Sequence, residues 1–156
     1  MDKITKRLQL IVLLCSLIPV TVQAQTARQI AQKAFSSVVL LAMEDANGQP
    51  ISLGSGFFVR EGVIATNLHV IEGAAKGYAK LVGQKTKYDI AGIAALDDNR
   101  DLVLLSIEGA KTPSLALGDS SLMAVGDEVY AVGNPQGLEG TFSQGIVSGI
   151  RRVGSD

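Results

Sequence analysis

The stretch GSGFFVREGVIATNLHVIEGA, from Gly54 to Ala74, determines how the rest of the chain is interpreted. Its two apolar runs, 57–59 and 63–65, are separated by a polar turn that ends in Gly62, which predicts a β-hairpin because glycine can supply the positive φ of a tight turn. His69 follows the second run, at the start of a short helical turn that a later glycine should stop. A strand end of this kind holds a side chain rigidly while it stays accessible.

His69 is the only histidine in the sequence, and a lone histidine is by default interpreted as a structural residue. The surrounding motif argues otherwise. Gly-Ser-Gly-Phe, a hairpin and then Ala-Thr-Asn-Leu-His-Val resemble the segment around the catalytic histidine of trypsin-like serine proteases, most closely those of the bacterial HtrA-like (Deg) group. The resemblance implies that His69 is the general base that takes the proton from a serine nucleophile and later returns it.

Asp101 is the carboxylate that we expect to pair with His69. It precedes the apolar run 102–105, and Asn-Arg-Asp-Leu-Val-Leu-Leu over residues 99–105 resembles the segment that carries the catalytic aspartate of HtrA-like proteases. In a triad this carboxylate accepts the Nδ1 hydrogen, fixes the tautomer and stabilises the imidazolium. Asp97 and Asp98 could do the same chemistry from the preceding polar turn, and they remain as alternatives.

Short apolar runs with almost no helix between them follow from Ser37 onward, which favours an antiparallel barrel or sandwich over a parallel sheet. We expect about six strands before Gly109, enough for one small closed barrel, at residues 38–41, 51–59, 63–65, 78–82, 88–96 and 102–107. After a connector at 111–113, a second β unit begins, with strands expected at 115–117, 128–132 and 142–150.

This second unit resembles the second barrel of the same family through its Gly-Asn-Pro turn at 133–135 and its Gly-Ile-Val-Ser segment at 145–148. The resemblance as a whole covers roughly residues 36–152. It implies an all-β, chymotrypsin/trypsin-like double β-barrel with a complete first barrel, a partial second barrel and a short N-terminal helix. The expected division is a signal peptide at 1–24, the helix at 25–36, the first barrel at 37–112 and the start of the second at 113–156.

The N-terminus has the pattern of a secretory signal, in which basic residues precede an apolar run from Leu8 to Val20 and small residues allow cleavage near Ala24. The alternative is a retained anchor, although a bilayer span needs about 20 apolar residues. Cys15 lies within the signal, after Leu14 rather than a small residue, so we expect no lipidation. The mature chain then has no cysteine for a disulfide and is expected in the periplasm or outside the cell.

Residues 26–36 show the apolar spacing of an amphipathic helix, with Thr26 as a plausible N-cap. We expect this helix to pack on the domain that follows. The alternative is a frayed tail beside the signal.

The nucleophile of HtrA-like proteases lies in a Gly-Asn/Ser-Ser-Gly-Gly segment beyond the Gly-Ile-Val-Ser strand, and these 156 residues contain no such segment. The same turn supplies the N–H groups of the oxyanion hole. Four serines that could be considered as substitutes do not fit the role: Ser55, which is expected to be structural, Ser143, Ser148 and Ser155. We therefore expect the chain to be a fragment of a longer protease and inactive as written.

The composition, with 47% hydrophobic residues and a formal net charge of −1, fits one ordinary soluble domain or part of a larger protein and suggests no nucleic-acid partner. One histidine and scattered carboxylates form no ligand cluster, so we expect no metal ion and no cofactor. The resemblance implies polypeptide substrates, and we expect no membrane association once the signal is cleaved. The oligomeric state stays open.

Two other hypotheses belong to different classes. The chain could be a non-catalytic, protease-like module that binds peptides or a partner protein by adding a strand to an exposed sheet edge. It could also be an unrelated secreted β-sandwich in which His69 and Asp101 are coincidental, and in that case the two side chains should lie far apart.

Overall fold

The computed structural model describes residues 24–134, 138 and 140–151. The expected signal peptide up to residue 23, with Cys15, lies outside the described residues, as do Pro135 of the Gly-Asn-Pro turn and Ser155. Within the described residues, no helix has the length and apolarity needed to cross a membrane.

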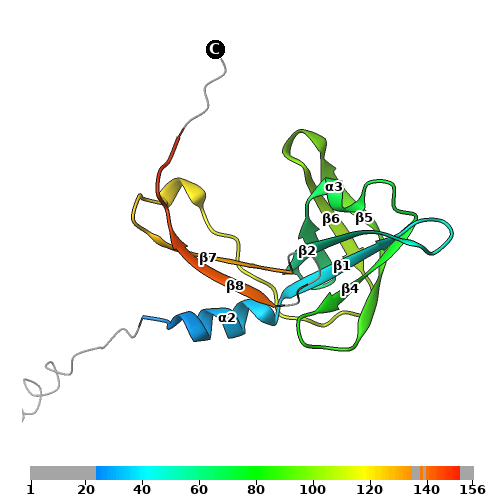
Figure 1. Ribbon diagram of the computed structural model, residues 1–156, viewed down its shortest axis with the longest axis horizontal. Coiled ribbons are helices and arrows are strands. Elements are labelled where there is room, and N and C mark those ends of the chain that lie inside the picture. The colour runs from blue at the N-terminus through cyan, green and yellow to red at the C-terminus, as the bar shows by residue number, and fades with distance from the viewer. Residues whose placement is uncertain (1–23, 135–137, 139, 152–156) are drawn as a thin grey trace, which may run out of the picture.

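Six antiparallel strands close into a barrel in the order β1-β2-β3-β6-β5-β4 (Figure 1). The expected first barrel and its number of strands are therefore confirmed. The strands are β1 (Val38–Glu44), β2 (Pro50–Arg60), β3 (Val63–Thr66), β4 (Lys76–Leu81), β5 (Lys87–Asp97) and β6 (Leu102–Ile107).

The hairpin expected around Gly62 joins β2 to β3, and Gly62 adopts a φ of 69°, the conformation that a side chain would disfavour. Strand β3 also pairs antiparallel with β6, and in this register Thr66 lies opposite Val103. This pairing places the end of β3 beside the start of β6. The two segments that hold His69 and Asp101 are thus brought together by the sheet itself.

The interior of the barrel is filled by apolar side chains that alternate along the strands, as expected for a closed sheet with one buried face. Fully buried members come from opposite walls, with Leu41 on β1, Phe58 on β2 and Leu105 on β6. The whole cluster comprises Val39, Leu41, Met43, Phe58, Ile64, Val70, Ala79, Leu81, Val103, Leu105, Ile107 and Ala110.

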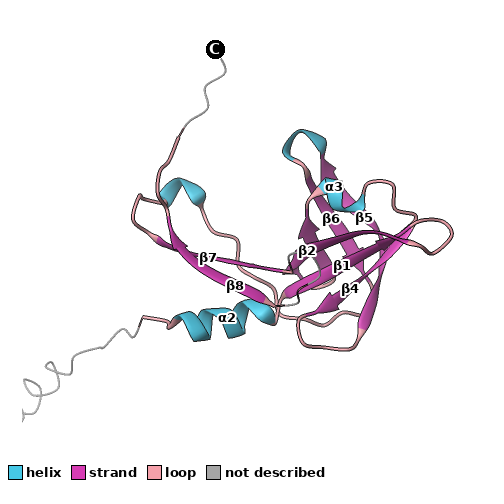
Figure 2. Ribbon diagram, viewed as in Figure 1, coloured by secondary structure: helices cyan, strands magenta, loops and turns pink. Residues whose placement is uncertain are grey.

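The second sheet is a hairpin of two antiparallel strands, β7 (Glu128–Gly133) and β8 (Thr141–Ile146), which extends away from the barrel in Figure 2. A closed barrel followed by a second, partial sheet is the expected double-barrel fold with an incomplete second part. The predominance of strand over helix in Figure 2 agrees with the all-β expectation.

Two expectations about the second unit were wrong in detail. Residues 115–117 form no strand, because only the Leu115 N–H finds a backbone partner there, the Phe58 carbonyl at 2.9 Å. The strand expected to run to residue 150 ends at Ile146, since Val147 closes the hairpin through backbone bonds to Gly126 and Asp127. Ser148 therefore lies beyond the strand that was expected to contain it.

The N-terminal helix α2 (Ala27–Phe35) forms as expected and begins with a reciprocal capping box. The Gln29 N–H donates to Thr26 Oγ1 at 3.3 Å, and the Thr26 N–H donates to Gln29 Oε1 at 2.9 Å. At the other end of the helix, Phe35 packs edge-on against Phe142 of β8, with ring centroids 6.4 Å apart. The helix thus packs on the second sheet rather than forming a frayed tail.

Candidate active site

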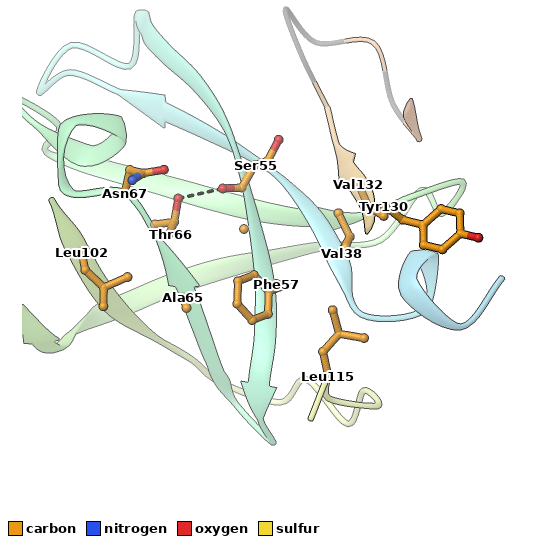
Figure 3. A pocket seen from close by; sticks show the side chains of 11 residues that line it. Val38, Ser55, Phe57, Ala65, Thr66, Asn67, Leu102, Leu115, Tyr130 and Val132 are labelled. Carbon is orange, nitrogen blue, oxygen red and sulfur yellow. Dashed lines mark hydrogen bonds between the residues drawn. The ribbon is translucent and has the colours of Figure 1, made fainter. Parts of the chain in front are cut away.

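The end of β3 is fixed from inside the barrel before the chain reaches His69. Thr66 is buried, and its Oγ1 donates to the Ser55 carbonyl at 2.8 Å, the bond drawn in Figure 3. Asn67 follows as the N-cap residue of α3 (Leu68–Ile71), the helical turn that was expected after the strand. His69 is the second residue of this turn.

A close approach between β2 and α3 determines where the helical turn sits. Val70 is buried in the barrel core, and a Cβ at Gly54 would come within 2.5 Å of Val70 Cγ1. Only a glycine at position 54 leaves room for Val70 at this point. Because Val70 is the neighbour of His69, the glycine of the Gly-Ser-Gly motif helps set the position of the imidazole.

Asp101 meets His69 through two hydrogen bonds. His69 Nδ1 lies 2.6 Å from Asp101 Oδ2, and the backbone N–H of His69 donates to Oδ1 at 2.9 Å. The carboxylate thus binds both the ring and the main chain of the same histidine. The side chains remain 66% and 45% exposed, so the pair is accessible to another molecule.

The ionised state of Asp101 is favoured by these bonds. The pKa of its carboxyl lies below the ordinary value, first because the His69 backbone N–H donates to it and second because of the imidazole. An ionised carboxylate is an acceptor for a hydrogen on Nδ1, and in a neutral imidazole with its hydrogen there Nε2 is the unprotonated ring nitrogen. That is the tautomer that a general base requires if it is to take a proton at Nε2.

The alternatives to Asp101 are placed differently. Asp97 forms an ion pair with Arg100, and its Oδ1 accepts the Arg100 N–H at 3.2 Å, so it caps the short turn η1 (Asp98–Arg100). Asp98 borders the same surface hollow as His69, but the bond to the ring comes from Asp101. The hypothesis of a coincidental pair required these groups to be far apart, and they are in contact.

A crevice of about 310 Å³ lies between the barrel and the second sheet (Figure 3). Its barrel wall includes Phe57 and Ala65, while Leu115 and Val132 approach from the other side. The crevice is lined by Val38, Ser55, Gly56, Phe57, Ala65, Thr66, Asn67, Leu102, Leu115, Tyr130 and Val132. Asn67 and Leu102 belong to the segments that carry the His–Asp pair, so the crevice reaches the side of the candidate site.

Two of the serines that were considered have other surroundings than the imidazole. Ser55 Oγ accepts the Asn134 N–H at 2.7 Å, which links the barrel to the second sheet, and Ser143 is exposed on β8. Among the residues that the structure describes, no serine hydroxyl bonds to His69. Among these described residues, there is also no group of three His, Cys, Asp or Glu side chains that could hold a metal ion.

Two contacts of this region were missed by the analysis of the sequence. Asn67 looked like part of a motif, but its side chain reaches Asp101, with Nδ2 3.2 Å from Oδ2. Ser55 was expected to be structural, and its hydrogen bond to Asn134 fits that role, but this partner 79 positions away had no signal in the local pattern.

A closed antiparallel barrel, a partial second sheet and an accessible His–Asp pair at the end of β3 define a protein of the chymotrypsin-like class. The family model of the trypsin-like peptidase domain matches residues 54–156, and the chain belongs to this family.

Curated relatives point to the same family. The chain is 41% identical over 104 residues to a "Probable periplasmic serine endoprotease DegP-like" of Halomonas elongata, covering 65% of this chain and 21% of the relative. It is 39% identical over 106 residues to "Protease Do-like 1, chloroplastic" of Arabidopsis thaliana (66% and 24%). It is 41% identical over 102 residues to "Putative serine protease HhoA" of a Synechocystis species (64% and 25%). The chain therefore spans about a fifth to a quarter of the length of these relatives.

Proposed function

We propose that this chain supplies the general base and its orienting carboxylate to a serine endopeptidase that cuts polypeptides. His69 takes the proton from the nucleophilic serine at Nε2 and gives it to the leaving amine, while Asp101 holds the Nδ1 hydrogen. The observation that carries the proposal is the paired contact, 2.6 Å between Nδ1 and Oδ2 and 2.9 Å between the His69 N–H and Oδ1. The names of the relatives support the same reaction, since two are called serine proteases or endoproteases and the third a protease.

The nucleophile is not assigned to any serine of these 156 residues. In the proposal it comes from a Gly-x-Ser-Gly-Gly segment of the family, which this sequence does not contain and which also supplies the oxyanion hole. We therefore expect the 156-residue chain alone to have no peptidase activity. If no such segment acts together with this chain in the natural protein, we propose the alternative function, a non-catalytic module that binds peptides.

The experiment begins with sequencing the transcript past codon 156 and then assays the encoded protein on an unfolded protein substrate. Cleavage that a serine-directed inhibitor abolishes, and that His69→Ala reduces by several orders of magnitude, would support the proposal. Cleavage that persists in His69→Ala, or a stop codon directly after codon 156 with no cleavage, would contradict it. Glu61→Ala, in the exposed turn of the β2–β3 hairpin, is the control variant.

We also propose that residues 1–24 are a cleaved signal and that the protein acts in the periplasm or outside the cell. The support is the basic and then apolar N-terminal pattern, together with relatives that are named periplasmic. N-terminal sequencing of the protein from the host should find a chain that begins near Gln25. Recovery of the intact N-terminus in the membrane fraction would favour the anchor instead.

A further inference from the structure

Asn67 stands between β3 and α3 at a position where asparagine usually caps a helix. Its side chain makes no capping hydrogen bond. Its Nδ2 instead lies 3.0 Å from the carbonyl oxygen of Asp101 and 3.2 Å from Asp101 Oδ2. One amide group therefore reaches both the main chain and the carboxylate of a residue 34 positions away.

Asp101 has a conformation that needs such support. Its φ of 50° and ψ of 49° are left-handed, and among the described residues no other residue except glycine has a positive φ. A side chain in this region costs free energy, which surrounding contacts must offset. The Asp101 carbonyl accepts the Leu68 N–H at 3.2 Å as well as the Asn67 amide, so both donors come from the junction of β3 and α3.

The carboxylate is held in a similar way. Oδ2 faces two donors, His69 Nδ1 and Asn67 Nδ2, while Oδ1 accepts the His69 N–H. A carboxylate with donors at both oxygens is fixed in its rotation about the Cβ–Cγ bond. Without the Asn67 donor, Oδ2 would depend on the imidazole alone.

We propose that Asn67 is a positioning residue for the His–Asp pair, holding Asp101 in its left-handed conformation and keeping Oδ2 opposite Nδ1 of His69. This inference deepens the proposed function and rests on it. Asn67 acts through Asp101 and touches no reacting atom. Its chemistry is specific to an amide, because alanine has no donor and aspartate would place a second negative charge against Oδ2.

The test reads the tautomer of His69 in the full chain, from the ¹⁵N chemical shifts of its ring nitrogens at alkaline pH. The sequence has one histidine, so the assignment is unambiguous. The wild-type ring should carry its hydrogen on Nδ1, and Asp101→Asn gives the reference without a carboxylate. In Asn67→Ala, the ratio of the Nδ1–H to the Nε2–H tautomer should fall about five-fold towards that reference, the factor that the loss of one ordinary hydrogen bond corresponds to.

Ile107→Val is the control for general stability. It removes a buried methyl group at the opposite end of β6 from Asp101 and should lower stability without changing the tautomer ratio. Asn67→Asp keeps the size of the side chain and is the second variant if Asn67→Ala does not fold. It should shift the tautomer ratio in the same direction as Asn67→Ala.

The outcomes separate the two proposals. A wild-type ring with its hydrogen on Nε2 would overturn the His–Asp assignment, and with it the proposed function. A wild-type ring with its hydrogen on Nδ1 that is unchanged in the Asn67 variants would overturn the role of Asn67 alone. An equal shift in Ile107→Val would also overturn it, since the effect would then be one of general stability.

Discussion

His69 and Asp101 are joined by a ring contact and by a main-chain contact, and the two have different physical consequences. The bond at Nδ1 selects a tautomer, whereas the His69 N–H to Oδ1 ties the backbone of α3 to the carboxylate. The main-chain bond is the larger cause of the lowered pKa of Asp101. Asp101 thus supports the local structure as well as the chemistry of the ring.

The first prediction concerns the pH dependence of this support. The pKa of Asp101 is lower in the folded chain than in the unfolded chain, so its contribution to stability is present above the unfolded pKa of about 4 and is lost as pH falls through the folded value. Asp101→Asn should therefore be less stable than the wild type at neutral pH. The difference should shrink as the pH falls below about 4.

Urea unfolding of both proteins from pH 7 down to pH 2 measures this difference. Asp98→Asn, which changes the neighbouring carboxylate of the same surface hollow, is the control. A difference between wild type and Asp101→Asn that stays constant with pH would contradict the prediction.

At the scale of elements, the position of α3 depends on β2 as much as on its own sequence. The helical turn is four residues long and could not be stable alone. It is held by Val70, which is buried over Gly54, and by the bonds of its first residues to Asp101. The Gly-Ser-Gly motif and the histidine are therefore parts of one packing arrangement.

The second prediction follows from that packing. Gly54→Ala places a Cβ within 2.5 Å of Val70 Cγ1 and should destabilise the chain by about 1–3 kcal/mol, the usual cost of overpacking. The shifted helix should also move the backbone amide resonance of His69. Gly92→Ala on β5 is the matched control, since nothing lies within 4 Å of its Cβ, and it should be neutral or slightly stabilising. Equal effects of the two substitutions would contradict the argument.

The third prediction concerns the start of α2. Thr26→Ala removes the N-cap of its capping box and should cost about 1 kcal/mol of helix stability. Hydrogen exchange of the α2 amides would measure the loss, with the exposed Thr86→Ala as the control. Unchanged protection in α2 would show that the contact between Phe35 and Phe142 alone orders this helix.

The sequence predicted best those elements whose signals are local. The hairpin at Gly62, the capped helix at Thr26 and all six barrel strands follow from apolar alternation and turn residues, which depend only on neighbours along the chain. The run 115–117 has the same apolar character but forms no strand, because a strand also needs a partner and only the Leu115 N–H finds one. Nothing in a local pattern shows whether that partner exists.

The candidate site shows the same limit. A motif was enough to single out His69 and Asp101, but the side chain of Asn67 was hidden by its position, where an asparagine is expected to cap a helix. Its actual partner lies 34 positions away, across the β3–β6 pairing. Contacts between residues so far apart in the sequence depend on the register of the paired strands, and the sequence alone did not give that register.

At the scale of the whole molecule, the barrel has a continuous core, whereas the second sheet depends on a few links to it. The Asn134 N–H donates to Ser55 Oγ, and the segment that leads to the second sheet is tied to the barrel by the Leu115 N–H, which donates to the Phe58 carbonyl. Asn134 is only 2% exposed, and its Oδ1 accepts the Gly140 N–H at 3.0 Å, so a buried side chain joins the end of β7 to the residue before β8. Large apolar side chains of this unit, such as Leu122 and Ile146, are exposed.

Ser55 contacts both the second unit and the strand that leads to the candidate site. Its carbonyl holds Thr66 at the end of β3, and its hydroxyl holds Asn134 of the second sheet. In the proposed protease, the second barrel carries the nucleophile, so a residue bound to both parts helps set the distance between base and nucleophile. The roles of the Ser55 hydroxyl and of its backbone carbonyl can be tested separately, because a side-chain substitution removes only the hydroxyl.

The last prediction uses that separation. Ser55→Ala should leave the barrel folded but remove the acceptor of the Asn134 N–H, so exchange of this amide should become about five-fold faster or more, while the amides of the β3–β6 ladder keep their protection. Ser143→Ala, at an exposed serine of β8, should change neither. Faster exchange throughout the barrel would mean that Ser55 supports the core instead, and unchanged exchange at Asn134 would mean that the second sheet is held without this bond.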